Sequence, residues 1–197
     1  GAPTPTINAA VVMRLLSAAK TTRVAAAKLY GGPARHTCDV AALVAAAEQA
    51  LLAGKITVYA QGMSLLRAAA GTYGWGLNYA NIGPVWRAAC IIRADLLAAY
   101  ARQPDLRHLL LDEAFAQTVC QAEAGWRAVV RTGAELGIPL LAVAAALGYF
   151  DALRSDRLPA NLIQAQRDYF GAHTYHRIDR DGIFHSDWGQ AAPTDLT

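Results

Sequence analysis

Apolar residues recur at helical spacing along most of the chain, and they rarely alternate with polar residues as they do in a sheet. In the first segment, residues 5–30, they lie three or four positions apart and predict one buried stripe, formed by Ile7, Val11, Leu15 and Ala18. The pattern therefore predicts an all-α fold with several helices.

Glycine, proline and capping residues divide the pattern into separate helices. The run Gly31-Gly32-Pro33 ends the first segment, and Asp39 is placed to cap a long second helix that reaches about residue 73. Gly171 is expected to supply the left-handed stop of the last helix. The other predicted helices cover residues 81–101, 113–136, 139–153 and 159–170, with a short apolar turn at 109–111.

Two glycines interrupt the long second helix. Gly54 and Gly62 each lower helix propensity by about 1 kcal/mol relative to alanine. Because a missing side chain lets another backbone approach, we expect a close helix–helix contact at both positions.

From His176 onward the helical pattern stops, which predicts an extended, polar tail. Its isolated aromatic residues, Phe184 and Trp188, would each forgo about 1.5–3 kcal/mol of burial if they stayed exposed. We therefore expect both to dock, either on the chain's own helices or on a second subunit. This divides the chain into a helical domain, residues 1–175, and a tail, residues 176–197.

Composition excludes several classes of function. The chain has 197 residues, 54% of them apolar, which is enough for one well-buried core. Its net charge of +3 is dispersed, so it predicts no nucleic-acid partner. The longest nearly uncharged stretch, residues 138–150, is shorter than the roughly 20 residues of a bilayer crossing, so no membrane partner is expected.

The cysteines indicate the compartment. Cys38, Cys90 and Cys120 are far apart and odd in number, which is typical of reduced core thiols rather than of a disulfide framework or a zinc site. No secretion signal opens the chain. We therefore expect a cytoplasmic protein without a bound metal.

The segment 166–175, QRDYFGAHTY, carries the clearest candidate chemistry. It places Arg167 one turn before the expected helix stop and His173 just beyond it. A guanidinium offers a planar fork of donors to phosphate oxygens, and a nearby imidazole can donate to the same anion. The same residues also fit an ordinary helix end with an exposed arginine and histidine, and the local pattern leaves both interpretations open.

Other motifs extend the picture along the whole chain. They are RVAAAK at 23–28, GKI at 54–56 with YAQG at 59–62, LNY at 77–79, WR at 86–87 with CIIR at 90–93, GIP at 137–139, LPANLIQA at 158–165 and FHSDW at 184–188. Together with QRDYFGAHTY, and in this order, they resemble the C-terminal helical domain of 6-phosphogluconate dehydrogenases.

The resemblance implies an enzyme of the pentose phosphate pathway and of gluconate utilisation. That enzyme oxidatively decarboxylates 6-phosphogluconate to ribulose 5-phosphate and CO2, reduces NADP and needs no metal. The resemblance also implies a homodimer with a shared substrate site. In that site Arg93 contacts the phosphate from one subunit, and Arg167 and His173 contact it from the other.

The resemblance covers only part of such an enzyme. In the family, a Rossmann domain that binds most of the NADP and the proton-transfer residues precede this region, and this chain has no G-x-G-x-x-G motif after a strand. We therefore expect no catalytic residue in the chain and no turnover by the chain alone. The alternative is a non-catalytic helical module for interaction or dimerisation, although the joint presence of Arg93, Arg167 and His173 weighs against it.

Overall fold

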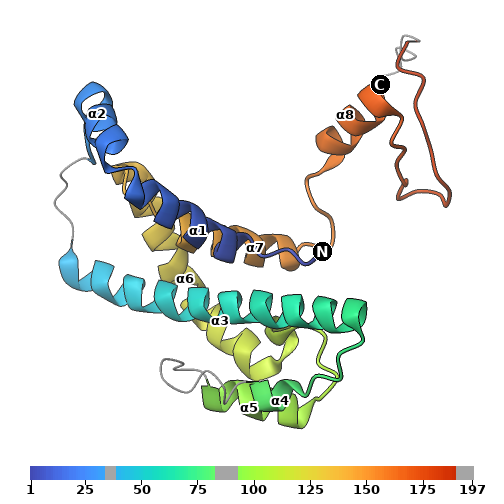
Figure 1. Cartoon of the computed structure of the whole chain (residues 1–197), viewed down its shortest axis with the longest axis horizontal. Coiled ribbons are helices and arrows are strands. Elements are labelled where there is room, and N and C mark those ends of the chain that lie inside the picture. The colour runs from blue at the N-terminus through green and yellow to red at the C-terminus, as the bar shows by residue number, and fades with distance from the viewer. Residues whose placement is uncertain (34–38, 83–92, 190–197) are drawn as a thin grey trace. The chain divides into compact units, whose positions relative to one another are not determined.

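The computed structural model describes residues 1–33, 39–82 and 93–189, without the side chains of Arg93 and Ala94. This part of the chain is helical and contains no strand, so the all-α prediction is confirmed (Figure 1). The elements are α1 (Pro5–Ala18), α2 (Lys20–Tyr30), α3 (Val40–Tyr73), α4 (Tyr79–Ile82), α5 (Arg93–Arg102), the 3-10 helix η2 (Leu109–Leu111), α6 (Glu113–Leu136), α7 (Leu141–Leu153) and α8 (Asn161–Gly171).

The chain forms two compact units, Gly1–Leu153 and Arg154–Thr197. Helix α8 thus belongs with the extended tail, and the other helices form the first unit. The division at 175/176, which assigns substrate binding and dimerisation to one side, stays a prediction.

Most helix ends follow the local chemistry of the sequence. The Asp39 carboxylate accepts a hydrogen bond from the Ala42 N–H at 3.1 Å and caps α3 as predicted. Gly74 and Gly137 end α3 and α6 in the left-handed conformation, with φ of 70° and 69°. Helix α7 begins at Leu141, two residues later than predicted. Most of the helix predicted over 81–101 lies outside the described residues.

The first predicted helix is in fact two helices, because the backbone leaves the helical conformation at Ala19. The break frees carbonyl groups at the end of α1, and Arg23 satisfies them. Its Nε donates to the Leu16 carbonyl at 2.9 Å and its Nη2 to the Ser17 carbonyl at 3.1 Å. Apolar spacing alone could not indicate this local replacement of backbone donors by a side chain.

The core of the first unit lies where α3 packs against α6. A Cβ built on Gly125 of α6 would lie 3.1 Å from the Cα of Ala46 on α3, so the two backbones approach closely there. Trp126 is fully buried beside this crossing, and its Nε1 donates to the Val143 carbonyl of α7. A Cβ on Gly54 or Gly62 would meet nothing within 4 Å, so the close contact predicted at these positions is wrong.

Helix α1 packs on α7 and α3 with a different face from the one predicted. Thr6 and Ala9 are buried, whereas Val11 and Leu15 of the predicted stripe are exposed. A buried polar clamp accounts for this rotation. The side chain of Gln61 on α3 accepts from the Thr6 N–H at 3.1 Å and donates to the Thr6 hydroxyl at 2.8 Å. Turning α1 to bury Val11 would break both hydrogen bonds.

Two further expectations meet the structure here. Helix α3 is long and apolar enough to span a membrane by length and composition alone, a test that the core helix of a soluble protein also passes. It packs against α6, α7 and η2. Cys120 is exposed on α6, so the prediction that it is a core thiol is wrong. Cys38 and Cys90 lie outside the described residues.

Candidate functional site

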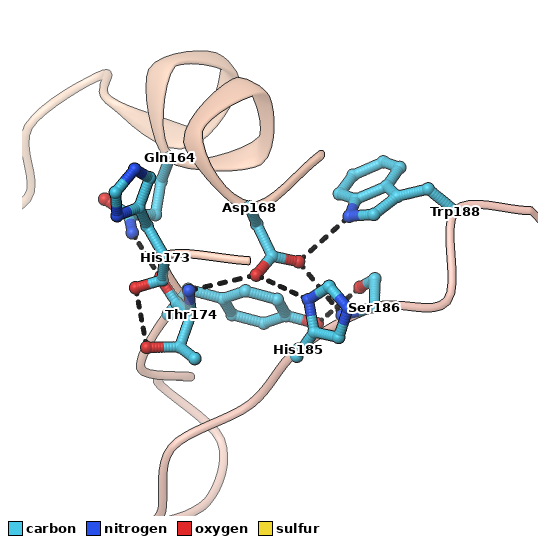
Figure 2. A network of polar contacts seen from close by, with 8 residues as sticks. Gln164, Asp168, His173, Thr174, His185, Ser186 and Trp188 are labelled. Atoms are coloured by element: carbon cyan, nitrogen blue, oxygen red, sulfur yellow. Dashed lines mark hydrogen bonds and ion pairs between the residues drawn. The ribbon is translucent and has the colours of Figure 1, made fainter. Parts of the chain in front are cut away.

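Helix α8 presents two unlike faces. Gln164 and Asp168, one turn apart, bond to the segment that follows the helix (Figure 2). The remaining surface of α8 carries large apolar side chains that are exposed within this chain, namely Leu162, Ile163, Tyr169 and Phe170. Arg167 lies on this exposed side.

The end of α8 adopts a conformation that is unusual for its residues. Gly171 remains within the helix, and the left-handed residue that follows is Ala172, with φ of 45°, so the predicted stop at Gly171 is wrong by one position. Thr174 is also left-handed, with φ of 62°. Such a conformation costs about 1–3 kcal/mol at a residue other than glycine and persists only where surrounding contacts hold it. The conformation of the turn 172–174 must therefore be stabilised by contacts with the residues around it.

The absent side chain of Gly171 makes room for the ring of His173. A Cβ built on Gly171 would lie 2.8 Å from Nε2 of His173, which is too close for a real contact. The imidazole also meets the Phe170 ring edge to face, with ring centroids 6.4 Å apart. A side chain at position 171 would thus require the His173 ring to move.

Arg167 and His173 lie together at the end of α8, as predicted from the sequence. The His173 N–H donates to the Arg167 carbonyl at 3.4 Å. Both residues are exposed, and within the described residues the Arg167 guanidinium makes no hydrogen bond or ion pair. By contrast, Arg177 of the tail forms an ion pair with Asp179 at 2.6 Å. No other side chain of the described residues therefore occupies the Arg167 donors.

Asp168, next to Arg167, is fully buried and joins α8 to the rest of its unit. Its two carboxylate oxygens accept four hydrogen bonds at 2.9–3.0 Å (Figure 2). The donors are the Thr174 N–H, His185 Nδ1, the Ser186 N–H and Trp188 Nε1. Because an ionised carboxylate can only accept, His185 carries its proton on Nδ1.

The charge of Asp168 is held by these donors. Burial raises the pKa of the carboxyl, but the hydrogen bonds from Ser186, His185 and Trp188 outweigh burial and lower the pKa to about 2. Asp168 is thus ionised at neutral pH. The sequence around Asp168 does not indicate this role, and the signal that could have identified it is the run of donors in FHSDW at residues 184–188.

The tail folds back on its own unit. Tyr175 and Phe184 exchange two backbone hydrogen bonds as an isolated antiparallel pair, and their rings pack together. The Trp188 ring meets Tyr169 of α8 edge to face, with centroids 5.9 Å apart. Trp188 therefore contacts one of the chain's own helices, whereas Phe184 packs on Tyr175 outside the helices. Docking on a second subunit stays a prediction.

The third predicted ligand, Arg93, is the first residue of α5 in the other unit, and its side chain lies outside the described residues. Its role stays a prediction. Among the residues that the structure describes, no group of three or more His, Cys, Asp and Glu side chains is arranged to hold a metal ion.

Comparisons with known proteins agree with these features. The family model of the 6-phosphogluconate dehydrogenase C-terminal domain matches residues 1–188. The decarboxylating 6-phosphogluconate dehydrogenases of Synechococcus elongatus and Escherichia coli K12 are each 47% identical to the chain, over 95% of its length and 41% of their own. The chain thus spans about two fifths of these relatives.

A solved structure gives the same result for the fold. The 6-phosphogluconate dehydrogenase of Plasmodium falciparum, studied in its apo form and in complexes with NADP+ and with 6-phosphogluconate, superimposes with a TM-score of 0.86. It is 36% identical and covers 95% of this chain and 42% of its own. The predicted family is confirmed: the chain belongs to the family of 6-phosphogluconate dehydrogenase C-terminal domains.

Proposed function

We propose that this chain is the phosphate-binding and dimerisation part of a decarboxylating 6-phosphogluconate dehydrogenase. In the whole enzyme, the C3 hydride of 6-phosphogluconate would pass to NADP, and the resulting β-keto acid would lose CO2 to leave ribulose 5-phosphate. The enzyme would act in the pentose phosphate pathway, in the cytoplasm. One observation carries the proposal: Arg167, whose guanidinium has no partner among the described residues, lies at the same helix end as His173, in a chain of this family.

At this helix end a phosphate can be bound by side chains but not by the backbone. The C-terminus of a helix carries a partial negative charge, which disfavours an anion by about 0.3–1 kcal/mol. One hydrogen bond between charged groups contributes about 1.5–3 kcal/mol, so the Arg167 fork and the His173 imidazole together outweigh that repulsion. Holding the phosphate would fix the sugar so that its C3 faces the nicotinamide, which is an orientation effect.

NADP would be bound by a part of the enzyme outside this chain. No strand leads into a glycine-rich loop among the described residues, so they do not fit a dinucleotide site. We expect the purified chain to form no NADPH from 6-phosphogluconate and NADP, as followed by absorbance. Turnover by the chain alone would contradict this assignment.

Calorimetric titration tests phosphate binding directly. We expect the chain to bind 6-phosphogluconate and to bind gluconate, which lacks the phosphate, much more weakly. Arg167→Ala should weaken 6-phosphogluconate binding roughly 10- to 100-fold, because one charge-assisted contact is lost. The matched control is Arg131→Ala on α6, an arginine 72% exposed and 4.0 Å from Glu135, which should bind as the parent chain does. Equal binding of both sugars, or an unchanged affinity after Arg167→Ala, would refute the proposal.

The site is proposed to be shared between two copies of the chain, with Arg93 facing Arg167 and His173 of the partner. The exposed apolar residues of α8 support association, because a surface of this kind is more stable against another protein than in water. Light scattering should therefore give the mass of a dimer. A monomer at micromolar concentrations would leave the shared site unassembled.

A mixing experiment separates a shared site from one within a single copy. Arg93→Ala and Arg167→Ala dimers should each bind 6-phosphogluconate weakly. In a mixed dimer with a two-fold axis, one shared site has both changes and the other has neither. After subunit exchange, about one quarter of all sites should regain parent affinity. If each site lies within one copy, or if Arg93 is not a ligand, no such recovery above the separate dimers is expected.

The alternative function is a helical interaction module that has kept the fold without binding substrate. The same apolar side chains of α8 favour it, since association does not need Arg167. Such a module would dimerise normally, and its weak response to 6-phosphogluconate would be the same with and without Arg167. The titration therefore discriminates between the two functions.

A further inference from the structure

We propose that Asp168 is a positioning residue that holds His173 and the tail against α8 and leaves the neighbouring Arg167 free to bind the substrate phosphate. This inference rests on the proposed phosphate site but adds a residue that would not touch the substrate itself.

The Asp168 carboxylate accepts as many hydrogen bonds as its geometry allows. An ionised carboxylate has about four lone-pair positions, and here four donors occupy them. Oδ1 accepts from the Thr174 N–H and from His185, and Oδ2 accepts from the Ser186 N–H and from Trp188 (Figure 2). The carboxylate is thus saturated from within its own unit. It has no position left for an ion pair with Arg167, the adjacent residue in the sequence.

Asp168 supports the turn that carries His173. His173 lies between Ala172 and Thr174, both left-handed, and such residues need external support. Asp168 holds the N–H of Thr174 at 3.0 Å, and Gln164, one helical turn earlier, donates to the carbonyl of Thr174 at 2.5 Å. Side chains of α8 therefore bind both the N–H and the carbonyl group of Thr174. Without Asp168 the turn would relax to ordinary backbone angles and carry His173 with it.

Asp168 also binds the tail. Three of its four donors come from residues 185–188, which lie 17 to 20 positions after Asp168 in the chain. Asp168 is also the only buried residue among the described residues of its unit, 154–189. Since no other buried side chain holds the described part of the tail, Asp168 contributes strongly to its position, beside the Tyr175–Phe184 pair and the ring contact of Trp188 with Tyr169. A change at Asp168 should therefore act on both the turn and the tail.

The test is Asp168→Asn in the full 197-residue chain. The amide keeps the shape of the side chain and one acceptor oxygen, but its NH2 group must face two of the four donors. We expect faster hydrogen exchange at Thr174, Ser186 and the Trp188 indole N–H. We also expect at least a 10-fold loss of affinity for 6-phosphogluconate and little change for gluconate. A role in stability alone would not reduce this preference for the phosphorylated sugar.

Two further variants keep the inference testable if Asp168→Asn disturbs the fold. Trp188→Phe removes one of the four donors and should give a smaller change of the same kind. Gly171→Ala leaves all four hydrogen bonds intact but takes the space of the His173 ring. It should weaken binding as much as His173→Ala does, while the tail stays protected from exchange.

The outcomes distinguish this inference from the proposed function. If Arg167→Ala removes the preference for the phosphorylated sugar and Asp168→Asn does not, phosphate binding stands and the positioning role is wrong. If exchange at Thr174 and in the tail is unchanged in Asp168→Asn, the positioning role is wrong whatever the affinity. If Asp168→Asn loosens the turn but Arg167→Ala leaves binding unchanged, the proposed function fails instead.

Discussion

Each of the two units of the chain is stabilised internally by a different kind of buried side chain. In Gly1–Leu153 the buried residues are mainly apolar and meet where α3 packs on α6, with Trp126 fully buried. In the described residues of the second unit, the only buried side chain is the charged Asp168. A unit of this size rarely stabilises itself by apolar burial alone. The first unit should therefore be sensitive to lost volume, and the second to lost charge or lost donors.

The largest effect should follow from emptying the apolar core. Trp126→Ala removes a fully buried ring and its hydrogen bond to Val143, so unfolding of the first unit should become easier by about 3–5 kcal/mol. Thermal unfolding followed by circular dichroism measures this. The control is Trp75→Ala, because Trp75 is 50% exposed and should cost much less. Equal losses from the two variants would show that the first unit is not organised around Trp126.

Acid should act on the other unit. Because the folded pKa of Asp168 is lowered to about 2 from an ordinary 3.8, its contribution is fully present above about pH 4 and is lost as pH falls through 2. His185 is the titratable group that faces it. We expect the Trp188 indole N–H to exchange faster over this range before α3 and α6 lose protection. Asp168→Asn should show no such step, and a step of the same size in that variant would assign it to another group.

A matched pair of glycine substitutions probes the apolar unit more finely. Gly125→Ala inserts a Cβ 3.1 Å from the Ala46 backbone, and overpacking of this kind costs about 1–3 kcal/mol, partly offset by helix propensity. Gly54→Ala meets nothing within 4 Å and should stabilise the chain by about 1 kcal/mol. Denaturant midpoints should therefore move in opposite directions. Movement in the same direction would contradict the close approach of α3 and α6 at Gly125.

The smallest effect is expected from a surface ion pair of the first unit. Arg127 of α6 donates to Glu123 and to Asp151 of α7, but it is 40% exposed. Arg127→Met should cost about 0.2–1 kcal/mol, and less at high salt. Denaturant unfolding at two salt concentrations measures this. A loss as large as that of Trp126→Ala would mean that charge pairs stabilise both units, which would remove the contrast between them.

The sequence predicted those parts of the fold that depend on local chemistry. Asp39 caps α3 as predicted, and α3 and α6 end at the predicted residues 73 and 136, each followed by a left-handed glycine, Gly74 or Gly137. The prediction of the buried face of α1 was wrong because that face is set by the Thr6–Gln61 clamp, which joins residues 55 positions apart. No local pattern contains such a contact.

The candidate site shows the same division. The placement of Arg167 and His173 at one helix end could be predicted because both lie within one short segment, and their binding role stays a prediction. The role of Asp168 could not, because three of its donors come from a distant part of the tail. Gly171 was identified as special for the wrong reason, since its neighbour Ala172 takes the left-handed conformation and Gly171 instead makes room for His173.

The central claim is that Arg167 and His173 bind the phosphate of the substrate. Phosphorus NMR of 6-phosphogluconate observes that group itself, so titrating the sugar with the chain is the most direct measurement. We predict a saturable shift of the phosphorus signal with the parent chain and with Arg131→Ala, and at least a 10-fold weaker response with Arg167→Ala and with His173→Ala. An unchanged response in those two variants would contradict the account.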